Sequence, residues 1–482
     1  MPGVLQSAAK RAPDAPALIC DGDVLTYAEL LESARRAAES LVVAGVQVDE
    51  PVGVWLPNGT EWAIAAYGIL FAGARVVPIN MRYTVAEVAD IVVRSGCRTI
   101  VTEVRGGGRG LGSAAPITVP ELLGTAFYGA EVERRIGSLS ANRIAYVQYT
   151  SGTTGRPKGA LLSHGGLVET TRSWVRIVGL NAEDRYPVVA PFSHIGGHKT
   201  GLLAGAVAGA ALLPWPALDP AALTRMVVSQ KVTFLQGPPT LYQALLDQPG
   251  MPVGQIRVAV TGAAVIPREL VGALRERLGV GAVFTAYGLT EAGGVCTMTR
   301  ADDAGFAVAH TVGRPIPGVE IRIDACDGPG EILVRSPGLM TGYQDDPEAS
   351  AAALEDGWLR TGDIGELDAR GRLRVVDRIK DMVIVGGLNV YPAEVEQVMA
   401  EHPDAGSVAV IGIPHERMGE VPAAFVTGPA DHADLSRHCA RRLAGFKTPR
   451  TIWTVAELPV NAAGKVDKPQ LREWALDRAQ SA

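Results

Sequence analysis

The sequence has 482 residues, of which 47% are hydrophobic and 20% charged, a composition that can bury the core of an ordinary globular protein. This apolar content excludes an intrinsically disordered chain, and 56 glycines with 32 prolines exclude a coiled coil. The 45 Lys and Arg against 51 Asp and Glu give a formal net charge of −6, which disfavours a nucleic-acid-binding protein. An anionic ligand would therefore have to be bound by donors gathered at one place.

The cysteines and the apolar segments bear on the compartment. The five cysteines form neither a CxxC pair nor a disulfide framework, which argues against a zinc site: Cys20, Cys97, Cys296, Cys326 and Cys439. The first 20 residues contain no apolar segment of signal-peptide length, so we expect a cytoplasmic protein. The apolar segment 201–215 is shorter than the roughly 20 residues that span a bilayer. We expect it to form a buried helix that runs into a strand, with no membrane span.

Helices and strands are predicted to alternate over the first 300 residues. A helix is expected to start after Thr26, because Glu29 follows at the spacing of a capping box, and Gly45 is its expected end. Short β-branched segments recur at 52–57, 75–80, 98–103, 231–237, 256–262 and 282–288. Strands that alternate with helices are typical of βαβ units, so we predict an α/β fold with parallel sheets.

The pattern changes from about residue 310. Turn pairs such as Pro317-Gly318 and Asp356-Gly357 separate short β segments, which predicts β-hairpins or a small β-barrel. Beyond about Arg378 the sequence predicts a strand, then a helix at 393–402 and a strand at 405–414. We therefore expect a small α+β domain at the carboxyl end.

The segment 149–159, YTSGTTGRPKG, follows a predicted strand and is rich in Ser, Thr and Gly. Small residues let backbone N–H groups converge on an anion, hydroxyls add donors, and Lys158 adds a positive charge. This chemistry predicts a phosphate-binding loop. By composition alone, a Ser/Thr/Gly linker is the alternative.

Other known loop motifs fit the sequence poorly. A Walker A loop needs Gly-Lys followed by Ser or Thr, whereas Lys158 follows Pro157 and precedes Gly159. The GxSxG motif of α/β-hydrolases is absent, so Ser151 has no independent claim to be a nucleophile. The glycines of 105–113 do not match GxGxxG, and we expect a surface loop there.

YTSGTTGRPKG resembles the signature of the adenylate-forming enzymes, which include acyl-CoA synthetases, adenylation domains of peptide synthetases and firefly-type luciferases. Six further motifs similar to those of this family follow in order: PFSHIGG (191–197), TGAA (261–264), TAYGLTE (285–291), WLRTGD (358–363), DRIKDMVIVGGLNVYPAEVE (377–396) and NAAGKVDK (461–468). The resemblance implies an N-terminal domain, 1–379, of two parallel-type αβ sheets plus a small β-barrel. A mobile α+β domain, 380–482, would follow on a hinge.

The resemblance also implies where ATP binds. The phosphates would be held by Thr150, Ser151, Gly152, Thr153, Thr154, Gly155 and Lys158. The nucleoside and the α-phosphate would be bound by Ala263, Ala264, Tyr287, Gly288, Thr290, Asp363, Arg378 and Lys465. In this assignment Tyr287 stacks on adenine, Asp363 bonds the ribose hydroxyls, and Glu291 is the Mg²⁺ ligand.

Further roles are implied by the same resemblance. The catalytic residues would be His194, Thr290, Glu291 and Lys465, with Lys465 stabilising the charge that develops as a carboxylate attacks the α-phosphate. Lys380 would be the hinge residue, and Gly386 and Gly387 would line the CoA channel.

The acyl pocket is expected to contain Phe192, His194, Lys199, Gly262 and Ala264. Small residues in and around these motifs predict an open pocket that accepts a bulky acid. PFSHIGG and TGAAV contain no arginine that could pair with a second carboxylate, which disfavours a dicarboxylic acid as substrate. Lys199 keeps a dicarboxylic acid as an open alternative. The segments GPPTLYQALLDQP, TAYGLTEAGG and GFKTPR resemble actinobacterial ligases that activate steroid-derived acids. A medium-length fatty acid or an aromatic acid is the alternative.

The implied activity is an ATP- and Mg²⁺-dependent acid–thiol ligase that makes an acyl-adenylate and then transfers the acyl group to CoA. A separate acyl carrier protein is the alternative acceptor, because no carrier segment follows Lys465. A luciferase-like oxygenase and a non-catalytic ATP-binding protein are two other classes. The second would be expected to lack Lys465, Asp363 or Glu291, and all three are present. The sequence leaves the oligomeric state open, with a symmetric dimer as the generic default.

Overall fold

The computed structural model describes residues 1–103, 111, 114–124, 129–150, 157–215, 219–262, 268–303, 305–326, 328–461 and 465–480. The chain divides into two compact units. The first unit is Met1–Ile321 with Leu333–Arg360, and the second unit is Arg322–Ile332 with Thr361–Ala482. The predicted hinge boundary at 379/380 stays a prediction.

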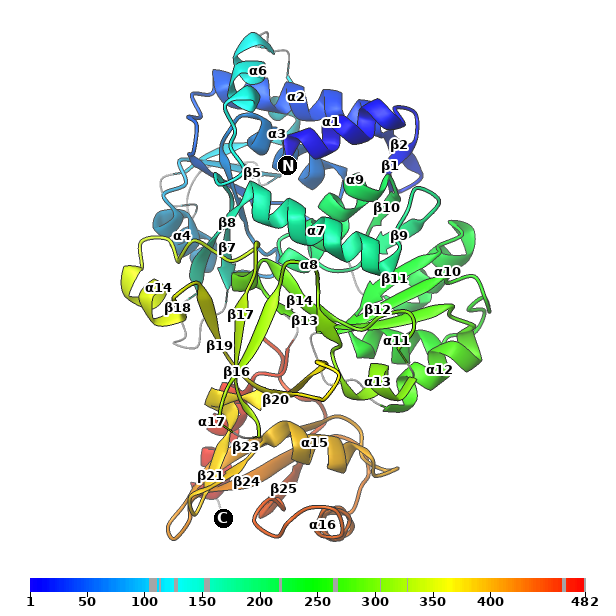
Figure 1. Ribbon diagram of the computed structural model, residues 1–482, viewed down its shortest axis with the longest axis vertical. Helices are drawn as coiled ribbons and strands as arrows, with labels where there is room; N and C mark the ends of the chain where they lie inside the picture. The colour runs from blue at the N-terminus through cyan, green and yellow to red at the C-terminus, as the bar shows by residue number, and fades with distance from the viewer. Residues whose placement is uncertain are drawn as a thin grey trace. The chain divides into compact units, whose positions relative to one another are not determined.

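A nine-stranded sheet of the described chain runs through the first unit, with mainly parallel strands (Figure 1). Its order is β15 (Arg314–Pro315), β14 (Gly294–Met298), β13 (Ala282–Leu289), β12 (Val258–Gly262), β11 (Phe234–Gly237), β9 (Arg185–Val188), β10 (Ala211–Pro214), β1 (Pro16–Cys20) and β2 (Asp23–Thr26). Only the strands at its two ends, β2, β14 and β15, pair antiparallel among these described residues. Parallel sheets need crossover connections, and helices supply them here.

A second sheet of the first unit has six strands within the described residues. Its order is β6 (Ala115–Ile117), β5 (Thr99–Thr102), β3 (Pro51–Trp55), β4 (Arg75–Pro78), β7 (Ile144–Thr150) and β8 (Lys158–Ser163). Its pairs are parallel apart from β7 with β8. The parallel sheet architecture predicted from the alternating pattern, and the two parallel-type sheets implied by the resemblance, are confirmed.

Helices cover these sheets (Figure 1). The capping box at Thr26 and Glu29 starts α2 as predicted, with Glu29 Oε2 accepting from the Thr26 N–H at 2.8 Å. The helices among the described residues of the first unit are α1 (Pro2–Arg11), α2 (Tyr27–Val43), α3 (Thr60–Phe71), α4 (Val85–Ser95), α5 (Val119–Leu122), α6 (Gly129–Gly137), α7 (His164–Val178), α8 (Ile195–Gly197), the π-helix η1 (His198–Leu203), α9 (Ala204–Ala208), α10 (Pro220–Ser229), α11 (Pro239–Leu246), α12 (Arg268–Leu278), the 3₁₀ turn η2 (Thr290–Ala292), α13 (Gly305–His310) and α14 (Pro347–Ala353). The apolar segment 201–215 forms η1, α9 and β10, the predicted buried helix running into a strand. No helix that the structure describes is both long and apolar enough to cross a membrane.

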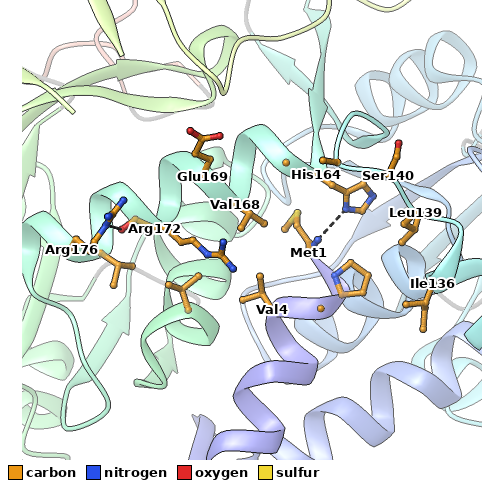
Figure 2. Close-up of a pocket in the computed structure, with 16 residues that line it drawn as sticks. Met1, Val4, Ile136, Leu139, Ser140, His164, Val168, Glu169, Arg172 and Arg176 are labelled. Carbon is orange, nitrogen blue, oxygen red and sulfur yellow. Dashed lines mark hydrogen bonds between the residues drawn. The ribbon is translucent and has the colours of Figure 1, made fainter. Parts of the chain in front are cut away.

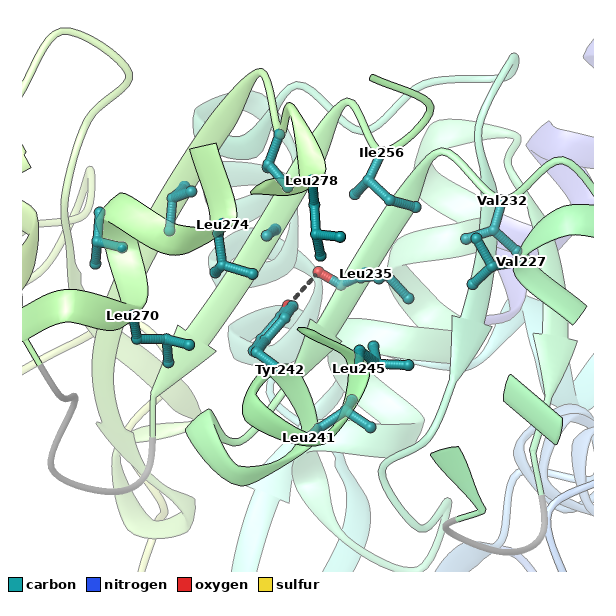
Figure 3. Close-up of a cluster of buried hydrophobic side chains, with 14 of the residues drawn as sticks. Val227, Val232, Leu235, Leu241, Tyr242, Leu245, Ile256, Leu270, Leu274 and Leu278 are labelled. Atoms are coloured by element: carbon teal, nitrogen blue, oxygen red, sulfur yellow. Dashed lines mark hydrogen bonds between the residues drawn. The ribbon is translucent and has the colours of Figure 1, made fainter. Parts of the chain in front are cut away.

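Figure 3 shows the core beneath α10, α11 and α12. Leu241, Leu245 and Leu274 are fully buried there against β11 and β12. The Tyr242 hydroxyl lies 2.9 Å from the carbonyl oxygens of both Leu235 and Val260, so one buried side chain ties α11 to two neighbouring strands. This packing holds the ends of β12 and β13, where the predicted site residues lie.

The predicted β-hairpins form a five-stranded sheet among the described residues. It contains β16 (Glu320–Asp324), β17 (Gly330–Arg335), β19 (Trp358–Leu367), β18 (Leu354–Glu355) and β20 (Leu373–Arg378), and β19 pairs antiparallel with β18 and β20.

The second unit contains a further five-stranded sheet in the described part of the chain. Its strands are β22 (Leu388–Val390), β21 (Val383–Val385), β24 (Gly419–Val426), β23 (Val408–His415) and β25 (Thr451–Thr454). Side chains along β23 and β24 alternate between two cores. One core contains residues of α15 (Pro392–Ala400) and α16 (His432–Ala440), and the other contains residues of α17 (Lys468–Gln480). The predicted small α+β domain is confirmed.

Candidate active site

Three predicted nucleotide-binding residues, Tyr287, Gly288 and Thr290, lie at or just after the end of β13, next to the predicted Mg²⁺ ligand Glu291. A β-bulge between Tyr287 and Gly288 shifts the register against β14, and the 3₁₀ turn η2 follows. Bulges re-aim side chains, so Tyr287 is partly exposed while Thr290 is buried. Gly288 has backbone on its inner side, because an added Cβ would lie 2.0 Å from the Gly294 carbonyl oxygen.

Glu291 is held by hydroxyls from two distant segments. Its Oε1 accepts from the Thr150 hydroxyl at 3.1 Å and from the Tyr343 hydroxyl at 3.1 Å. Burial and the Glu291 charge raise the pKa of Tyr343, so the phenol stays protonated and donates. The sequence did not indicate Tyr343, which lies 52 residues from Glu291 and belongs to no recognised motif.

Lys158 joins this group. It is the first residue of β8, paired with Thr150 at the end of β7, so the two residues flank the predicted phosphate-binding loop. Its Nζ lies 5.3 Å from the centre of the Tyr343 ring, a cation–π distance. The loop residues Ser151, Gly152, Thr153, Thr154 and Gly155 lie outside the described residues. Thr150, Lys158, Glu291 and Tyr343 thus bring two hydroxyls, a cation and a carboxylate together.

This group suits a divalent cation that is shared with a phosphate ligand. Mg²⁺ prefers oxygen ligands and is commonly held by one or two carboxylates together with substrate phosphates. Glu291 supplies a carboxylate beside two hydroxyl oxygens. The described residues contain no cluster of three His, Cys, Asp or Glu side chains that would hold a metal by themselves. The residues present therefore fit Mg²⁺ bound together with a nucleotide.

Three of the predicted acyl-pocket residues, Phe192, His194 and Lys199, lie on or before η1. His194 caps the short helix α8, its Nδ1 accepting from the Gly196 N–H at 3.0 Å, and its side chain is exposed. Phe192 is fully buried against Trp62, with ring centres 5.3 Å apart. Gly262, at the end of β12, would place a Cβ 2.5 Å from the Ala286 carbonyl oxygen, so glycine permits close pairing with β13. Ala263 and Ala264 lie outside the described residues.

His198 and Gln148 form a buried pair that the sequence did not indicate. The His198 ring stacks on Tyr146 with centres 4.1 Å apart, and its Nε2 lies 3.0 Å from Gln148 Oε1. Gln148 Nε2 donates to the Ser193 carbonyl at 2.9 Å, which fixes the start of the PFSHIGG segment. Burial holds the pKa of His198 well below its ordinary value, so the imidazole is neutral and its role here is structural.

Lys199 is fully buried on η1, and its Nζ has no hydrogen-bond partner among the described residues. Burial lowers its pKa to about 7. A lysine without a partner in the interior is costly unless a ligand provides one.

In the second unit, Asp363 and Arg378 lie opposite each other on β19 and β20. Arg378 Nε is 3.1 Å from Asp363 Oδ1; the carboxylate is buried, and the arginine is half exposed. The Asp363 N–H donates to the Thr361 hydroxyl at 3.1 Å. The pair places a buried carboxylate beside an accessible guanidinium, and ribose binding by these two residues stays a prediction.

Lys380 is exposed in the 3₁₀ turn η3 (Ile379–Asp381), immediately after β20. Gly386 and Gly387 form the exposed turn between β21 and β22, with φ values of 58° and 87°. Two successive residues with positive φ favour glycine in a tight hairpin. These positions suit the predicted hinge and CoA-channel roles, which stay predictions.

Lys465 is exposed in a loop whose base is closed by short contacts. Asn461 N–H donates to the Lys465 carbonyl at 2.8 Å, and the Lys465 N–H donates to Asn461 Oδ1 at 3.1 Å. Three residues further along, Lys468 Nζ lies 3.0 Å from Glu396 Oε1, and both side chains are mostly buried. Arg472 Nη2 lies 3.4 Å from Asp381, next to Lys380. Ion pairs therefore connect the helix after the Lys465 loop to α15 and to the predicted hinge segment.

A pocket of about 890 Å³ lies elsewhere in the first unit, between α1 and α7 (Figure 2). The Met1 amine lies 3.3 Å from His164 Nδ1 inside it, and burial lowers the pKa of His164 to about 3. Arg172 and Arg176 also line this pocket, and none of the predicted site residues does.

Family models of AMP-binding enzymes match most of the chain. A family model described as AMP-binding enzyme matches residues 5–344, and one described as AMP-binding enzyme C-terminal domain matches residues 394–465. A relative from Mycobacterium tuberculosis is 42% identical, over 98% of each chain, and is named a CoA ligase for a propanoyl group on a 7a-methyl-1,5-dioxo-octahydro-indene ring. A relative of the same name from Rhodococcus jostii is 40% identical, also over 98% of each chain. The structure of o-succinylbenzoate CoA synthetase from Bacillus subtilis with its acyl-adenylate intermediate matches with a TM-score of 0.88 and 28% identity, covering 98% of each chain. The same Bacillus enzyme has been solved with ATP and a magnesium ion.

Proposed function

The chain belongs to the AMP-binding enzyme family, and from this membership we propose which acid it activates and which of its residues do so. The family predicted from the seven motifs is confirmed. The protein is an acyl-CoA synthetase: a carboxylate attacks the α-phosphorus of ATP to give acyl-AMP and pyrophosphate, and the thiol of CoA then takes the acyl group and releases AMP.

The proposed nucleotide site rests on one observation, the carboxylate of Glu291 bound by Thr150 and Tyr343 beside Lys158. In our proposal, Lys158 and the loop that follows Thr150 bind the ATP phosphates, and Tyr287 packs against adenine. Glu291 holds Mg²⁺, which when bound offsets the repulsion between two anionic reactants. Asp363 and Arg378 bind the ribose hydroxyls.

The two half-reactions place different demands on the chain. Negative charge develops on the α-phosphate during adenylation, and we assign Lys465 to stabilise it, with Thr290 as a further donor. Thioester formation needs the adenylate carbonyl open to a thiol. The proposed rotation about Lys380 would withdraw Lys465 and present Gly386 and Gly387. Such closure also protects the mixed anhydride from water.

The proposed acid is a propanoate carried on a fused ring system that bears ketones, of the kind that partly degraded steroids provide. Two relatives at 42% and 40% identity carry names that specify such an acid, and each match spans 98% of both chains.

Free CoA is the proposed thiol, and the proposed compartment is cytoplasmic. The five cysteines, all within the described residues, form no disulfide, which suits a reducing compartment. A separate carrier protein as acceptor and a symmetric dimer stay as open expectations.

The proposal is tested by incubating the purified protein with Mg-ATP, CoA and a panel of acids. The panel contains a dioxo-indane propanoate, a medium-length fatty acid, an aromatic acid, malonate and acetate. Pyrophosphate, AMP and acyl-CoA are measured, and a holo carrier protein replaces CoA in a parallel series. We expect the ring acid to give the highest kcat/KM with CoA. A preference for acetate or malonate would exclude the ring acid, and acylation of the carrier alone would exclude CoA.

A further inference from the structure

Lys199 differs from Lys468, a second lysine that is mostly buried among the described residues. Lys468 pairs with Glu396 at 3.0 Å, and the carboxylates of Glu396, Asp377 and Asp381 raise its pKa. Lys199 is completely buried, and its Nζ has no hydrogen-bond partner within the described parts of the chain. Burial of an amine without a partner costs free energy, so the folded protein carries a donor that its own described groups leave unused.

The position of Lys199 points to a ligand. It lies on the π-helix η1, a local geometry that often occurs at functional sites. Its Nζ faces Gly294, where an added Cβ would lie 3.0 Å from the nitrogen. Gly294 pairs with Leu289 at the end of β13 and stands three residues after Glu291. The amine is therefore directed at the start of β14, which follows the turn η2 that carries Thr290 and Glu291.

The surroundings of the amine favour a neutral oxygen over a second carboxylate. The described groups near Nζ include Gly294, the Cys296 thiol and the neutral His198, and none of them carries a further positive charge that would support a second buried carboxylate. Burying a carboxylate there would add the desolvation of an anion to that of the amine. A ketone or hydroxyl oxygen costs far less to desolvate and still accepts a hydrogen bond.

We propose that Lys199 is a specificity-determining residue whose Nζ donates a hydrogen bond to a ketone or hydroxyl oxygen on the ring body of the acid, away from the carboxylate that is activated. This inference rests on the proposed function, since it concerns the acid of that same site. Acids that lack the ring oxygen would leave the amine buried without a partner and would be selected against.

The test compares Lys199→Met, which keeps the length and removes the donor, with Lys199→Gln, which keeps a donor. Lys10→Met on the exposed face of α1 is the matched control. Each protein is assayed for pyrophosphate release with a keto ring acid, its deoxo analogue, and a dicarboxylate of similar length. For Lys199→Met we expect kcat/KM to fall about 10- to 100-fold on the keto acid and to change less than about threefold on the deoxo acid. Lys199→Gln should recover part of the loss.

Two outcomes would overturn this inference and leave the proposed function standing. One is that kcat/KM of Lys199→Met falls equally on the keto and deoxo acids, or falls on neither. The other is a preference of the unmodified protein for the dicarboxylate, combined with loss of activity on the dicarboxylate in Lys199→Met. That result would assign the amine to a second carboxylate. If the unmodified protein adenylates none of the acids, the proposed function itself is wrong.

Discussion

The Tyr343 hydroxyl donates to Glu291 Oε1 at 3.1 Å, and this contact joins a turn before α14 to the end of β13. The same tyrosine ring lies beneath the Lys158 amine at 5.3 Å. One side chain therefore orients both the proposed Mg²⁺ ligand and a proposed phosphate-binding cation.

Tyr343→Phe should separate these two roles. It removes the hydrogen bond to Glu291 and keeps the ring under Lys158, so we expect kcat/KM for Mg-ATP in adenylation to fall about 10-fold, as for one hydrogen bond to a charged group. Tyr343→Ala removes both contacts and should lose more. Pyrophosphate release at varied Mg-ATP measures both. Equal activity of Tyr343→Phe and the unmodified protein would show that Glu291 needs no orientation.

Lys465→Ala should abolish adenylation selectively. We expect a loss of at least about 100-fold in pyrophosphate release from acid and ATP, because the cation acts on charge that develops only in the first transition state. Thioester formation from pre-made acyl-AMP and CoA should be largely retained. Equal losses in the two half-reactions would contradict a rotation that withdraws Lys465 before the second step.

Lys468→Met should destabilise the second unit. It leaves Glu396 without its cation in a mostly buried position, and loss of one partner of such a pair costs about 3 kcal/mol. Because α17 begins at Lys468, we also expect weaker adenylation through a less fixed Lys465 loop. Urea denaturation gives the free energy of unfolding. Lys468→Arg serves as the control and should retain most of the stability. If Lys468→Met is as stable as the unmodified protein, the ion pair contributes nothing to stability.

Lys199→Met should be more stable than the unmodified protein at neutral and acidic pH. An unfolded lysine has a pKa of about 10.4, whereas burial lowers the pKa of Lys199 to about 7. The unfolded chain therefore binds more protons between these values, and the stability of the unmodified protein gains with rising pH in this window. Among the described residues, His198 and Cys296 are the titratable groups that interact electrostatically with the amine.

We expect the stability advantage of Lys199→Met to be on the order of 2 kcal/mol at pH 6 and to shrink from pH 7 towards pH 10. Urea denaturation at pH 6, 7.5 and 9 measures it. A difference in unfolding free energy that is independent of pH would mean that the amine is paired in the folded protein. A more stable variant that is less active on keto acids would mark Lys199 as a residue kept for function.

Much of this protein follows from local sequence patterns. The capping box at Thr26, the alternation of β-branched and helical segments, and the turn pairs after residue 310 each depend on neighbouring residues only, and each predicted its element. The seven ordered motifs resemble those of the adenylate-forming family, and that family is confirmed. A phosphate-binding loop could be predicted because its chemistry requires small, hydroxyl-bearing and cationic residues close together in the chain.

Only the tertiary structure decided how distant residues meet. Tyr343 touches Glu291 across 52 residues, and no local pattern sets such a contact. The sequence alone does not distinguish Lys199 from Lys468. In the structure, Lys199 is buried beside Gly294, whereas Lys468 is paired with Glu396. The reason is physical: backbone propensity acts between near neighbours, whereas burial and charge pairing depend on which segments the packed sheets bring together.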